Sequence, residues 1–153
     1  MEKQEFFQKA KDLIECCSTL YLGTINRTLN SGESRAMANI RCLKKYPQNR
    51  LLFKENDLSN YIITSKSTDK TEELTEQETV SLYFYCEEYH RTLTLFGKAE
   101  LVEDSEIKNK LWSDEWKMYF SNGQEDDNYV VFKFIPKIAK YYDLKFDKVI
   151  MNL

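Results

Sequence analysis

Apolar residues recur along this chain with two different periods, which predict one amphipathic helix followed by short strands. In residues 3–17 the apolar side chains are three or four positions apart, which places them on one face of a helix. That face consists of Phe6, Ala10, Leu13, Ile14 and Cys17. Further along, apolar and polar residues tend to alternate, as in strands with one buried face. We expect strands at residues 19–25, 35–43, 61–64, 80–86, 93–102, 129–135 and 138–143.

The segments between these strands predict antiparallel pairing and two further helices. Residues 30–32 read Asn-Ser-Gly, a turn sequence of the kind that joins antiparallel strands. Helices are expected at residues 65–77 and from an N-cap at Asp104 or Ser105 to about residue 120. Residues 44–59 are polar and contain a proline, so we expect a long, exposed connection there.

This order of elements predicts a mainly β fold, a β-barrel or sandwich with peripheral α-helices. Six or seven mostly antiparallel strands leave edges that closure of the sheet or dimerisation would protect. The chain has 153 residues, the length of one domain, which we expect to span residues 1–153. A core of that size needs no disulfide or metal to be stable.

Composition and charge exclude several classes of function. The chain is 42% hydrophobic and 31% charged, as in globular proteins. Its net charge of −3 gives no electrostatic argument for binding nucleic acid or an anionic membrane. Its apolar runs are far shorter than the roughly 18 residues of a membrane span, and its N-terminus lacks a signal-peptide pattern. We therefore expect a cytoplasmic protein with neither a membrane nor a nucleic-acid partner.

Cysteine and histidine are too few and too scattered for metal or triad chemistry. The four cysteines include no CxxC pair, and they are Cys16, Cys17, Cys42 and Cys86. With His90 as the single histidine, a zinc site lacks ligands at usable spacing. We expect reduced, mostly buried thiols, and His90 at the surface or in a turn.

The segment that follows the strand at residues 61–64 has the composition of an anion site. Residues 64–70 read Thr-Ser-Lys-Ser-Thr-Asp-Lys, so four hydroxyls and two ammonium groups lie close together. Together with free N–H groups at a helix start, such groups can bind phosphate. The alternative is a solvated turn with Thr68 as N-cap. Arg35 begins a strand that we expect beside residues 61–64, from which its guanidinium would reach the same anion.

Several segments carry a recognisable pattern when they are taken in order. They are residues 35–41 (Arg-Ala-Met-Ala-Asn-Ile-Arg), 62–65 (Ile-Ile-Thr-Ser) with Lys70, 80–84 (Val-Ser-Leu-Tyr-Phe), 95–102 (Leu-Phe-Gly-Lys-Ala-Glu-Leu-Val), Leu111-Trp112 with Trp116, and 134–142 (Phe-Ile-Pro-Lys-Ile-Ala-Lys-Tyr-Tyr). Together they resemble the pyridoxamine 5′-phosphate oxidase-like flavoproteins, in their general-stress-protein branch. The resemblance covers about residues 5–142.

This resemblance implies a six-stranded antiparallel FMN-binding split barrel. Two such chains would form a homodimer with FMN in each of two clefts at the subunit interface. Arg35 and Lys70 would hold the FMN phosphate, with help from the hydroxyl of Thr68. The flavin would supply the redox chemistry, and the protein would supply phosphate binding and a shaped cleft.

The resemblance also implies which residues lie along the flavin. Positions expected to contact its ring or ribityl chain are Met37, Ala38, Asn39, Thr64 and Ser65. Trp112 or Trp116 would cover the flavin from the partner subunit, or else pack the helix against the barrel. Thr92 corresponds roughly to a flavin-facing position at which the oxidase family has a glutamine.

Two departures from the oxidase pattern argue against oxidation of pyridoxamine phosphate. Thr92 replaces the glutamine, and the sequence ends at Leu153 without the C-terminal Arg-x-His arrangement that binds the vitamin substrate. The remaining cations near the expected cleft include Arg41 and Arg91. We therefore expect FMN binding without that substrate.

Three functions stay open from the sequence. The first is a flavin-dependent oxidoreductase with an unknown small-molecule substrate. The second is a flavin-binding module without turnover, for storage or for redox and stress sensing; a deazaflavin or haem could occupy the same cleft. The third is a β-barrel that stacks single-stranded nucleic acid on Tyr83, Tyr85 and Tyr89, which the net acidic charge disfavours.

Overall fold

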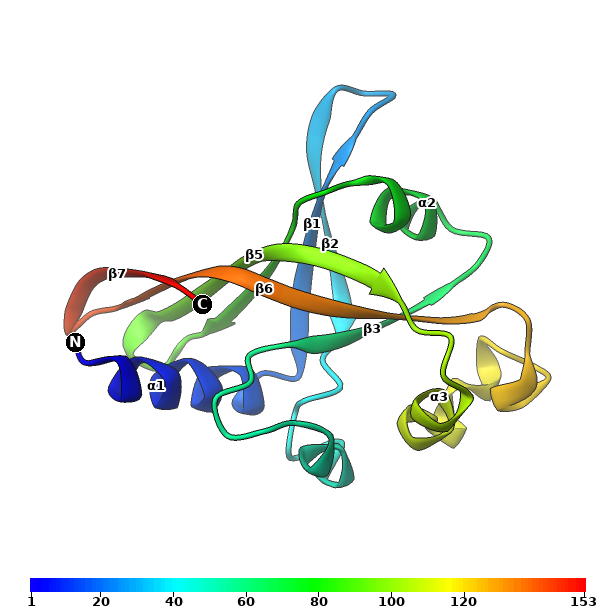
Figure 1. Ribbon diagram of the computed structural model, residues 1–153, viewed down its shortest axis with the longest axis horizontal. Coiled ribbons are helices and arrows are strands. Elements are labelled where there is room, and N and C mark those ends of the chain that lie inside the picture. Colours follow the sequence, from blue (N-terminus) through cyan, green and yellow to red (C-terminus); the bar gives the residue numbers. More distant parts are fainter.

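Within residues 1–145 and 148–153, which the computed structural model describes, seven strands form one antiparallel sheet that curls into a half-barrel (Figure 1). The strands are β1 (Thr19–Asn26), β2 (Ser31–Ala38), β3 (Asn60–Ser65), β4 (Val80–Cys86), β5 (Arg91–Leu101), β6 (Tyr129–Asp143) and β7 (Phe146–Asn152). Their order is β2-β1-β4-β5-β6-β3, and β7 pairs with β6. The predicted fold class is confirmed, with one strand more than the six that the resemblance implies.

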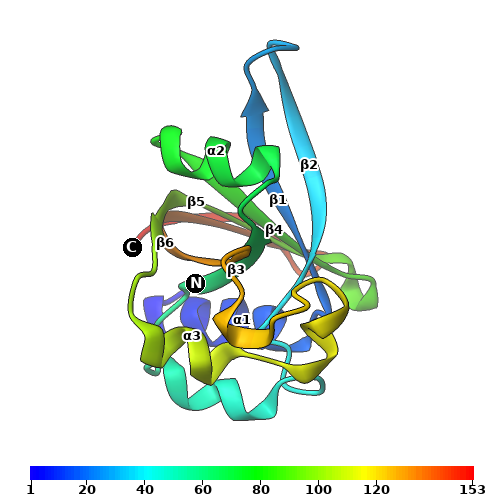
Figure 2. The same cartoon turned by 90° about the vertical axis from the view of Figure 1, so that its right-hand side faces the viewer.

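Three α-helices and four short 3-10 helices surround the sheet. They are α1 (Lys3–Cys16), α2 (Asp69–Glu76), α3 (Ser105–Leu111), η1 (Pro47–Leu52), η2 (Glu88–His90), η3 (Asp114–Met118) and η4 (Gly123–Glu125), as found in the described part of the chain. α2 lies beside the β1–β2 hairpin on one side of the sheet, and α1 lies on the other side (Figures 1 and 2). No helix in these described residues combines the length and apolarity of a membrane-spanning helix.

The apolar face predicted for α1 forms part of the main core. Phe6, Ala10, Leu13 and Ile14 are completely buried, and they pack with inward-facing residues of the sheet such as Leu22. Burial of one large apolar side chain contributes about 1.5–3 kcal/mol to the stability of the fold. The helical spacing of apolar residues at the N-terminus therefore correctly predicts the buried face of α1.

The two strands predicted on either side of Pro136 are in fact one continuous strand, β6. Its register with β5 shifts between Phe96 and Gly97, so Pro136 lies opposite Gly97 at a β-bulge. A side chain at Gly97 would collide with the backbone of Ile135 and Pro136. A bulge tolerates a residue without an N–H, so the proline does not end the strand.

The exposed connection expected at residues 44–59 is confirmed only in part, because exposed and buried residues are mixed along the segment. The segment contains η1, and Tyr46, Asn49 and Leu58 within it are buried. Tyr46 belongs to a second core, in which its ring packs against Trp116 with the centroids 6.1 Å apart. The buried residues of this second core are Ile40, Tyr46, Tyr61, Leu111, Trp116, Phe120, Tyr129 and Val131. The preceding strand also ends at Ala38, five residues earlier than predicted.

The helix predicted from Asp104 to about residue 120 is interrupted. Asp104 is the N-cap, and its carboxylate accepts a hydrogen bond of 2.9 Å from the backbone N–H of Glu106. However, α3 ends at Leu111, Trp112 leaves helical geometry, and η3 begins at Asp114. The break places Trp112 at the C-cap of α3 and Trp116 within η3.

The strand that carries Arg35 was expected beside the strand at residues 61–64, and this too is wrong. β2 pairs with β1, whereas β3 pairs with β6 at the other end of the strand order. Because the sheet curls, the two strands nevertheless come to line the same cavity, as described below.

Candidate functional site

A cavity of about 450 Å³ lies between the two ends of the curled sheet, a volume within the usual range of ligand pockets. Three groups of residues line it. The first comes from β2 and the second from β3 and the turn that follows it, and the third is an aromatic wall in and after η3. The lining residues are Ala36, Met37, Ala38, Ile63, Thr64, Ser65, Thr68, Lys70, Trp116, Tyr119 and Phe120.

Hydroxyl groups are gathered where β3 ends and α2 begins. Thr64 is buried, and its Oγ1 lies 3.0 Å from Oγ1 of Thr68. The Thr68 hydroxyl donates to the carbonyl of Ser65 at 3.0 Å and does not cap α2, although Thr68 is the N-cap residue. Ser65 Oγ lies 3.1 Å from Ser67 Oγ. The turn thus presents a compact cluster of hydroxyls at the cavity.

Lys70 supplies a positive charge at the same place. Its pKa is lowered because burial disfavours the charged form and because the Arg35 guanidinium repels it. No carboxylate among the described residues forms an ion pair with Lys70, although the chain is net acidic. An anion in the cavity would relieve this electrostatic cost.

Arg35 lies close enough to Lys70 to perturb it, but it does not line the cavity. Its Nη1 donates to Thr24 Oγ1 at 2.6 Å, and its Nη2 donates to Glu73 Oε2 at 2.6 Å and to Glu33. The Thr24 hydroxyl in turn donates to Glu73 at 2.6 Å. The cation predicted to contact phosphate is therefore already held between two carboxylates, which position it beside Lys70.

Aromatic side chains of the second core form the opposite wall. Trp116 and Phe120 are largely buried, whereas Tyr119 is 71% exposed at the cavity. Trp112 lies behind this wall, with its ring perpendicular to Trp116 and the centroids 5.9 Å apart, and its Nε1 donates to Asp114 at 3.1 Å. Within a single copy of the chain, Trp112 is thus a packing residue.

Two other predicted site residues lie away from the cavity. Asn39 is fully buried; its Nδ2 donates at 2.7 Å to the carbonyls of both Ile14 and Cys17, and its Oδ1 accepts from Asn60 at 3.0 Å. It therefore ties α1 to two strands. Thr92 lies at the start of β5, opposite Tyr85 of β4. The structure thus brings together Met37, Ala38, Thr64, Ser65, Thr68, Lys70 and Trp116 at the cavity, and it leaves out Arg35, Asn39, Thr92 and Trp112.

Sequence reasoning missed four lining residues, namely Ala36, Ile63, Tyr119 and Phe120. Ala36 precedes Met37 and Ile63 precedes Thr64, so each lies next to a predicted site residue in the same strand, and this position was a signal for both. Tyr119 and Phe120 were assigned to the end of a continuous helix. Their place at the cavity depends on the helix break at Trp112, which the sequence pattern did not reveal.

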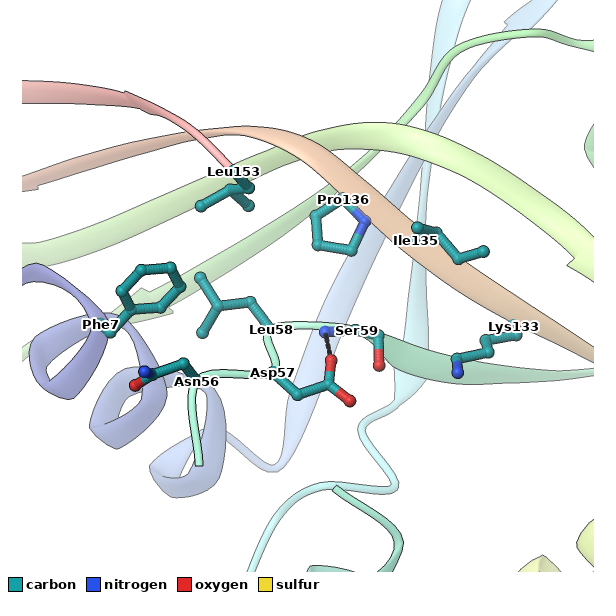
Figure 3. Close-up of a pocket in the computed structure, with 9 residues that line it drawn as sticks. All are labelled: Phe7, Asn56, Asp57, Leu58, Ser59, Lys133, Ile135, Pro136 and Leu153. Atoms are coloured by element: carbon teal, nitrogen blue, oxygen red, sulfur yellow. Dashed lines mark hydrogen bonds between the residues drawn. The ribbon is translucent and has the colours of Figure 1, made fainter. Parts of the chain in front are cut away.

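A second cavity, of about 310 Å³, lies between the start of α1 and β6 (Figure 3). Its walls are Phe7, Leu58, Ile135, Pro136 and Leu153, with a few polar groups between them. One of these is Asp57, whose carboxylate accepts a hydrogen bond of 2.8 Å from the Ser59 N–H. None of the predicted site residues lines this cavity. In the described part of the chain, its lining holds one hydroxyl residue, Ser59, and a carboxylate, Asp57, as well as its one cation, Lys133.

The described residues contain no group of three or more His, Cys, Asp or Glu side chains that could hold a metal ion. His90 is exposed in the turn between β4 and β5, as expected. The cavity therefore offers hydroxyls, one cation, backbone groups of β2 and aromatic surface, which suit an aromatic ligand that carries an anionic group.

Comparison with known proteins agrees with this picture of the fold. The chain is 26% identical over 140 residues to general stress protein 26 of Bacillus subtilis (strain 168), which covers 90% of this chain and 88% of that protein. A solved structure of a related protein from Clostridium acetobutylicum superposes with a TM-score of 0.77 at 21% identity, over 99% of this chain and 97% of the other. A haem-binding protein from Mycobacterium smegmatis has a TM-score of 0.70 at 10% identity, over 99% of this chain and 59% of its own.

The match to a family model covers almost the whole sequence. The model described as pyridoxamine 5′-phosphate oxidase like matches residues 5–153. Together with the general stress protein 26 relatives, this match confirms the resemblance inferred from the ordered segments. The chain belongs to the pyridoxamine 5′-phosphate oxidase-like family.

Proposed function

We propose that this protein binds FMN in the cavity beside Lys70, as a homodimer, and that it is a flavin-dependent oxidoreductase acting on a small molecule. When bound, a flavin supplies hydride and electron transfer. The residues of the chain would bind the phosphate, support the ring and shape the cleft for a substrate.

The observation that carries the proposal is the uncompensated charge of Lys70. The charge is partly desolvated, it is repelled by Arg35, and no carboxylate among the described residues pairs with it. A phosphate would accept a charge-assisted hydrogen bond from Lys70 and a further hydrogen bond from Ser65. The Thr68 hydroxyl would donate to it after turning away from the Ser65 carbonyl. Arg35 would contribute its positive charge from behind, where Glu73 holds it.

The rest of the cavity suits the flavin's ring system and its sugar-alcohol chain. Met37 and Ala38 present a β-strand edge to the cavity, whose N–H and C=O groups can pair with the polar edge of a flavin ring. Trp116 and Tyr119 offer aromatic surface for stacking. Thr64 lies between these regions, at the position suited to the ribityl chain.

A second copy of the chain would complete the site. Ala36 lines the cavity and is also the cross-strand partner of Tyr21, which in turn lies opposite Tyr83. Tyr21, Tyr83 and Tyr85 are about 40% exposed, at 41%, 38% and 41%, so this face carries aromatic surface next to the cavity. Directly opposite residues of paired strands point to the same side of a sheet, which places Thr92 on this face with Tyr85. Thr92 would then contact the flavin of the partner subunit.

The absorption spectrum of the purified protein tests the cofactor. The proposal predicts a yellow protein whose acid-released chromophore co-migrates with FMN in chromatography. A haem spectrum, a deazaflavin, or a protein that stays colourless after incubation with FMN would contradict it. Light scattering at micromolar concentration should give about twice the 18.2 kDa of one chain, and a mass near 18.2 kDa would refute the homodimer.

A flavin-binding module without turnover is the second candidate function. Within the described residues, the titratable side chains that line the cavity are Lys70 and Tyr119, and neither is paired with an acid or base. Anaerobic mixing of the FMN-loaded protein with NADH or NADPH separates the two functions. Bleaching of the flavin absorbance supports the oxidoreductase, and an unchanged spectrum with both donors supports the binding module.

A further inference from the structure

Three of the four cysteines lie near the end of α1 and the end of β4, and none of them lines the cavity beside Lys70. Cys16 and Cys17 end α1, and Cys86 ends β4. Cys17 Sγ donates to the carbonyl of Tyr85 at 3.3 Å, which joins the end of the helix to this strand. The Cys16 thiol donates to the carbonyl of Leu13 at 3.4 Å, and burial and the neighbouring Cys86 raise its pKa.

A guanidinium group lies on the same cluster. Arg91 is the cross-strand partner of Cys86, and its Nη2 donates a hydrogen bond of 3.1 Å to Cys86 Sγ. A cationic N–H donor stabilises negative charge on sulfur, and the thiolate is the nucleophilic form of cysteine. Arg91 also lines a surface cavity of about 360 Å³, so its side chain lies between the Cys86 sulfur and that cavity.

The three thiols differ in their surroundings. Cys16 is exposed, Cys86 is half-buried and Cys17 is buried. Burial and the neighbouring Cys16 raise the pKa of Cys17 to about 12, so this thiol stays protonated. Cys42 is buried among other residues and serves as an internal reference. The cluster therefore contains a sulfur beside a cation (Cys86), an accessible thiol (Cys16) and a buried, protonated thiol (Cys17).

We propose that Cys86 and Cys16 form a peroxide-responsive disulfide, with Arg91 activating Cys86. The Cys86 sulfur attacks hydrogen peroxide, the O–O bond breaks, and the departing hydroxide takes the thiol proton as water, which leaves a sulfenic acid on Cys86. The Cys16 sulfur then attacks this sulfenic sulfur. The S–S bond forms, the S–O bond breaks, and the second hydroxide leaves as water with the Cys16 proton. Two thiols lose two electrons and two protons in all, and one peroxide becomes two waters.

The disulfide would link the end of α1 to the start of the β4–β5 turn. In that turn Tyr89 and His90 have φ values of 57° and 50°, in the left-handed region that non-glycine residues seldom adopt. A link between Cys16 and Cys86 would thus fix the helix against a turn with two residues in the left-handed region. The proposal is independent of flavin binding, because neither cysteine lines the cavity beside Lys70.

Tryptic peptide mapping of the full-length protein provides the test. Cleavage after Lys11, Arg27, Lys70 and Arg91 yields peptide 12–27, which contains Cys16 and Cys17, and peptide 71–91, which contains Cys86. After treatment of the reduced protein with hydrogen peroxide, we expect these two peptides to be linked and the free thiols to fall from four to two. The link should form within one chain in a mixture of ¹⁴N- and ¹⁵N-labelled protein.

Matched variants assign the link to its residues. The link should disappear in Cys16→Ser and in Cys86→Ser, and it should persist in Cys17→Ser and in Cys42→Ser. Arg91→Gln should slow its formation about tenfold, the factor expected for loss of one charge-assisted hydrogen bond, whereas the exposed Arg27→Gln should not. The proposal is overturned if wild-type protein keeps four thiols, if the link joins two chains, or if Cys16→Ser still forms it.

Discussion

The Arg35 guanidinium donates a hydrogen bond of 2.6 Å to the Glu73 carboxylate, which joins β2 to α2 behind the cavity. Because of this contact, Arg35 is already bonded to a carboxylate and does not offer these hydrogen bonds to an anion in the cavity. An arginine that is shared with two carboxylates acts through its charge and through the position it gives its neighbours. Lys70, with no such partner among the described residues, is the cation that faces the cavity.

Changes to this pair should alter FMN affinity in opposite directions. Arg35→Ala removes a positive charge near the phosphate and should lower the affinity for FMN roughly tenfold or more. Glu73→Gln removes a negative charge and keeps an acceptor for Arg35, so it should strengthen FMN by about two- to tenfold. Fluorescence titrations with FMN and riboflavin measure both. If Glu73→Gln instead lowers the affinity for FMN, then the main effect of Glu73 is to position Arg35 through its charge. The expected repulsion between Glu73 and the phosphate would then be wrong.

The lowered pKa of Lys70 predicts a pH dependence of opposite sign for binding and for stability. FMN affinity should fall as the pH rises through this lowered pKa, below the ordinary lysine value of about 10.4, because neutral Lys70 no longer attracts phosphate. Over the same range, the contribution of Lys70 to the stability of the flavin-free protein should rise, because the unfolded chain binds the proton more tightly. Titrations between about pH 7.5 and 10 with wild type and Lys70→Ala check this. An equal decline for riboflavin would contradict it.

The part of the fold that the sequence predicted is the part set by local periodicity. The buried face of α1 and the strands β1, β4 and β5 follow from spacings of three to four or of two residues. The errors lie where distant groups decide the local structure. Pro136 stays within β6 because Gly97 provides the bulge opposite it. β7, which pairs with β6, was not predicted either.

The candidate site was predictable to a similar extent. The hydroxyl-rich turn and Lys70 stood out by composition, since their chemistry is local to residues 64–70. The environment of Asn39 was not predictable, because its partners are carbonyls of another element. The same holds for Arg41, which is 3% exposed and donates to the carbonyls of Asp57 and Ser59 at 2.6 and 2.8 Å.

Asn39 should therefore affect stability in the absence of any ligand. Asn39→Ala leaves the carbonyls of Ile14 and Cys17 without their side-chain donor, so we expect a loss of about 2–4 kcal/mol in the free energy of unfolding. Urea denaturation of the flavin-free protein measures it. Asn109→Ala, an exposed residue of α3, is the control and should change stability by less than about 0.5 kcal/mol. Equal effects of the two variants would show that Asn39 does not hold α1.

We expect no oxidation of pyridoxamine 5′-phosphate at an enzymatic rate. Its phosphate needs a second cationic clamp beside the flavin, and Arg41, a candidate from the sequence, is buried and occupied. Arg91 lies at the far end of β5, beside Cys86. An aerobic assay of the FMN-loaded protein for pyridoxal 5′-phosphate and hydrogen peroxide tests this. Turnover above about 0.01 per second, which is well below ordinary enzyme rates, would disprove it.

The central claim is that the phosphate of FMN binds at Lys70, and one comparison of affinities tests it most directly. Lys70→Ala should lower the affinity for FMN about ten- to hundredfold, which is the loss expected for one charge-assisted hydrogen bond. The affinity for riboflavin, which has no phosphate, should stay almost unchanged. Lys66→Ala is the matched control, because Lys66 lies in the turn that precedes α2 but is exposed and does not line the cavity. Equal losses of FMN and riboflavin affinity in Lys70→Ala, or equal losses of FMN affinity in both variants, would contradict the account.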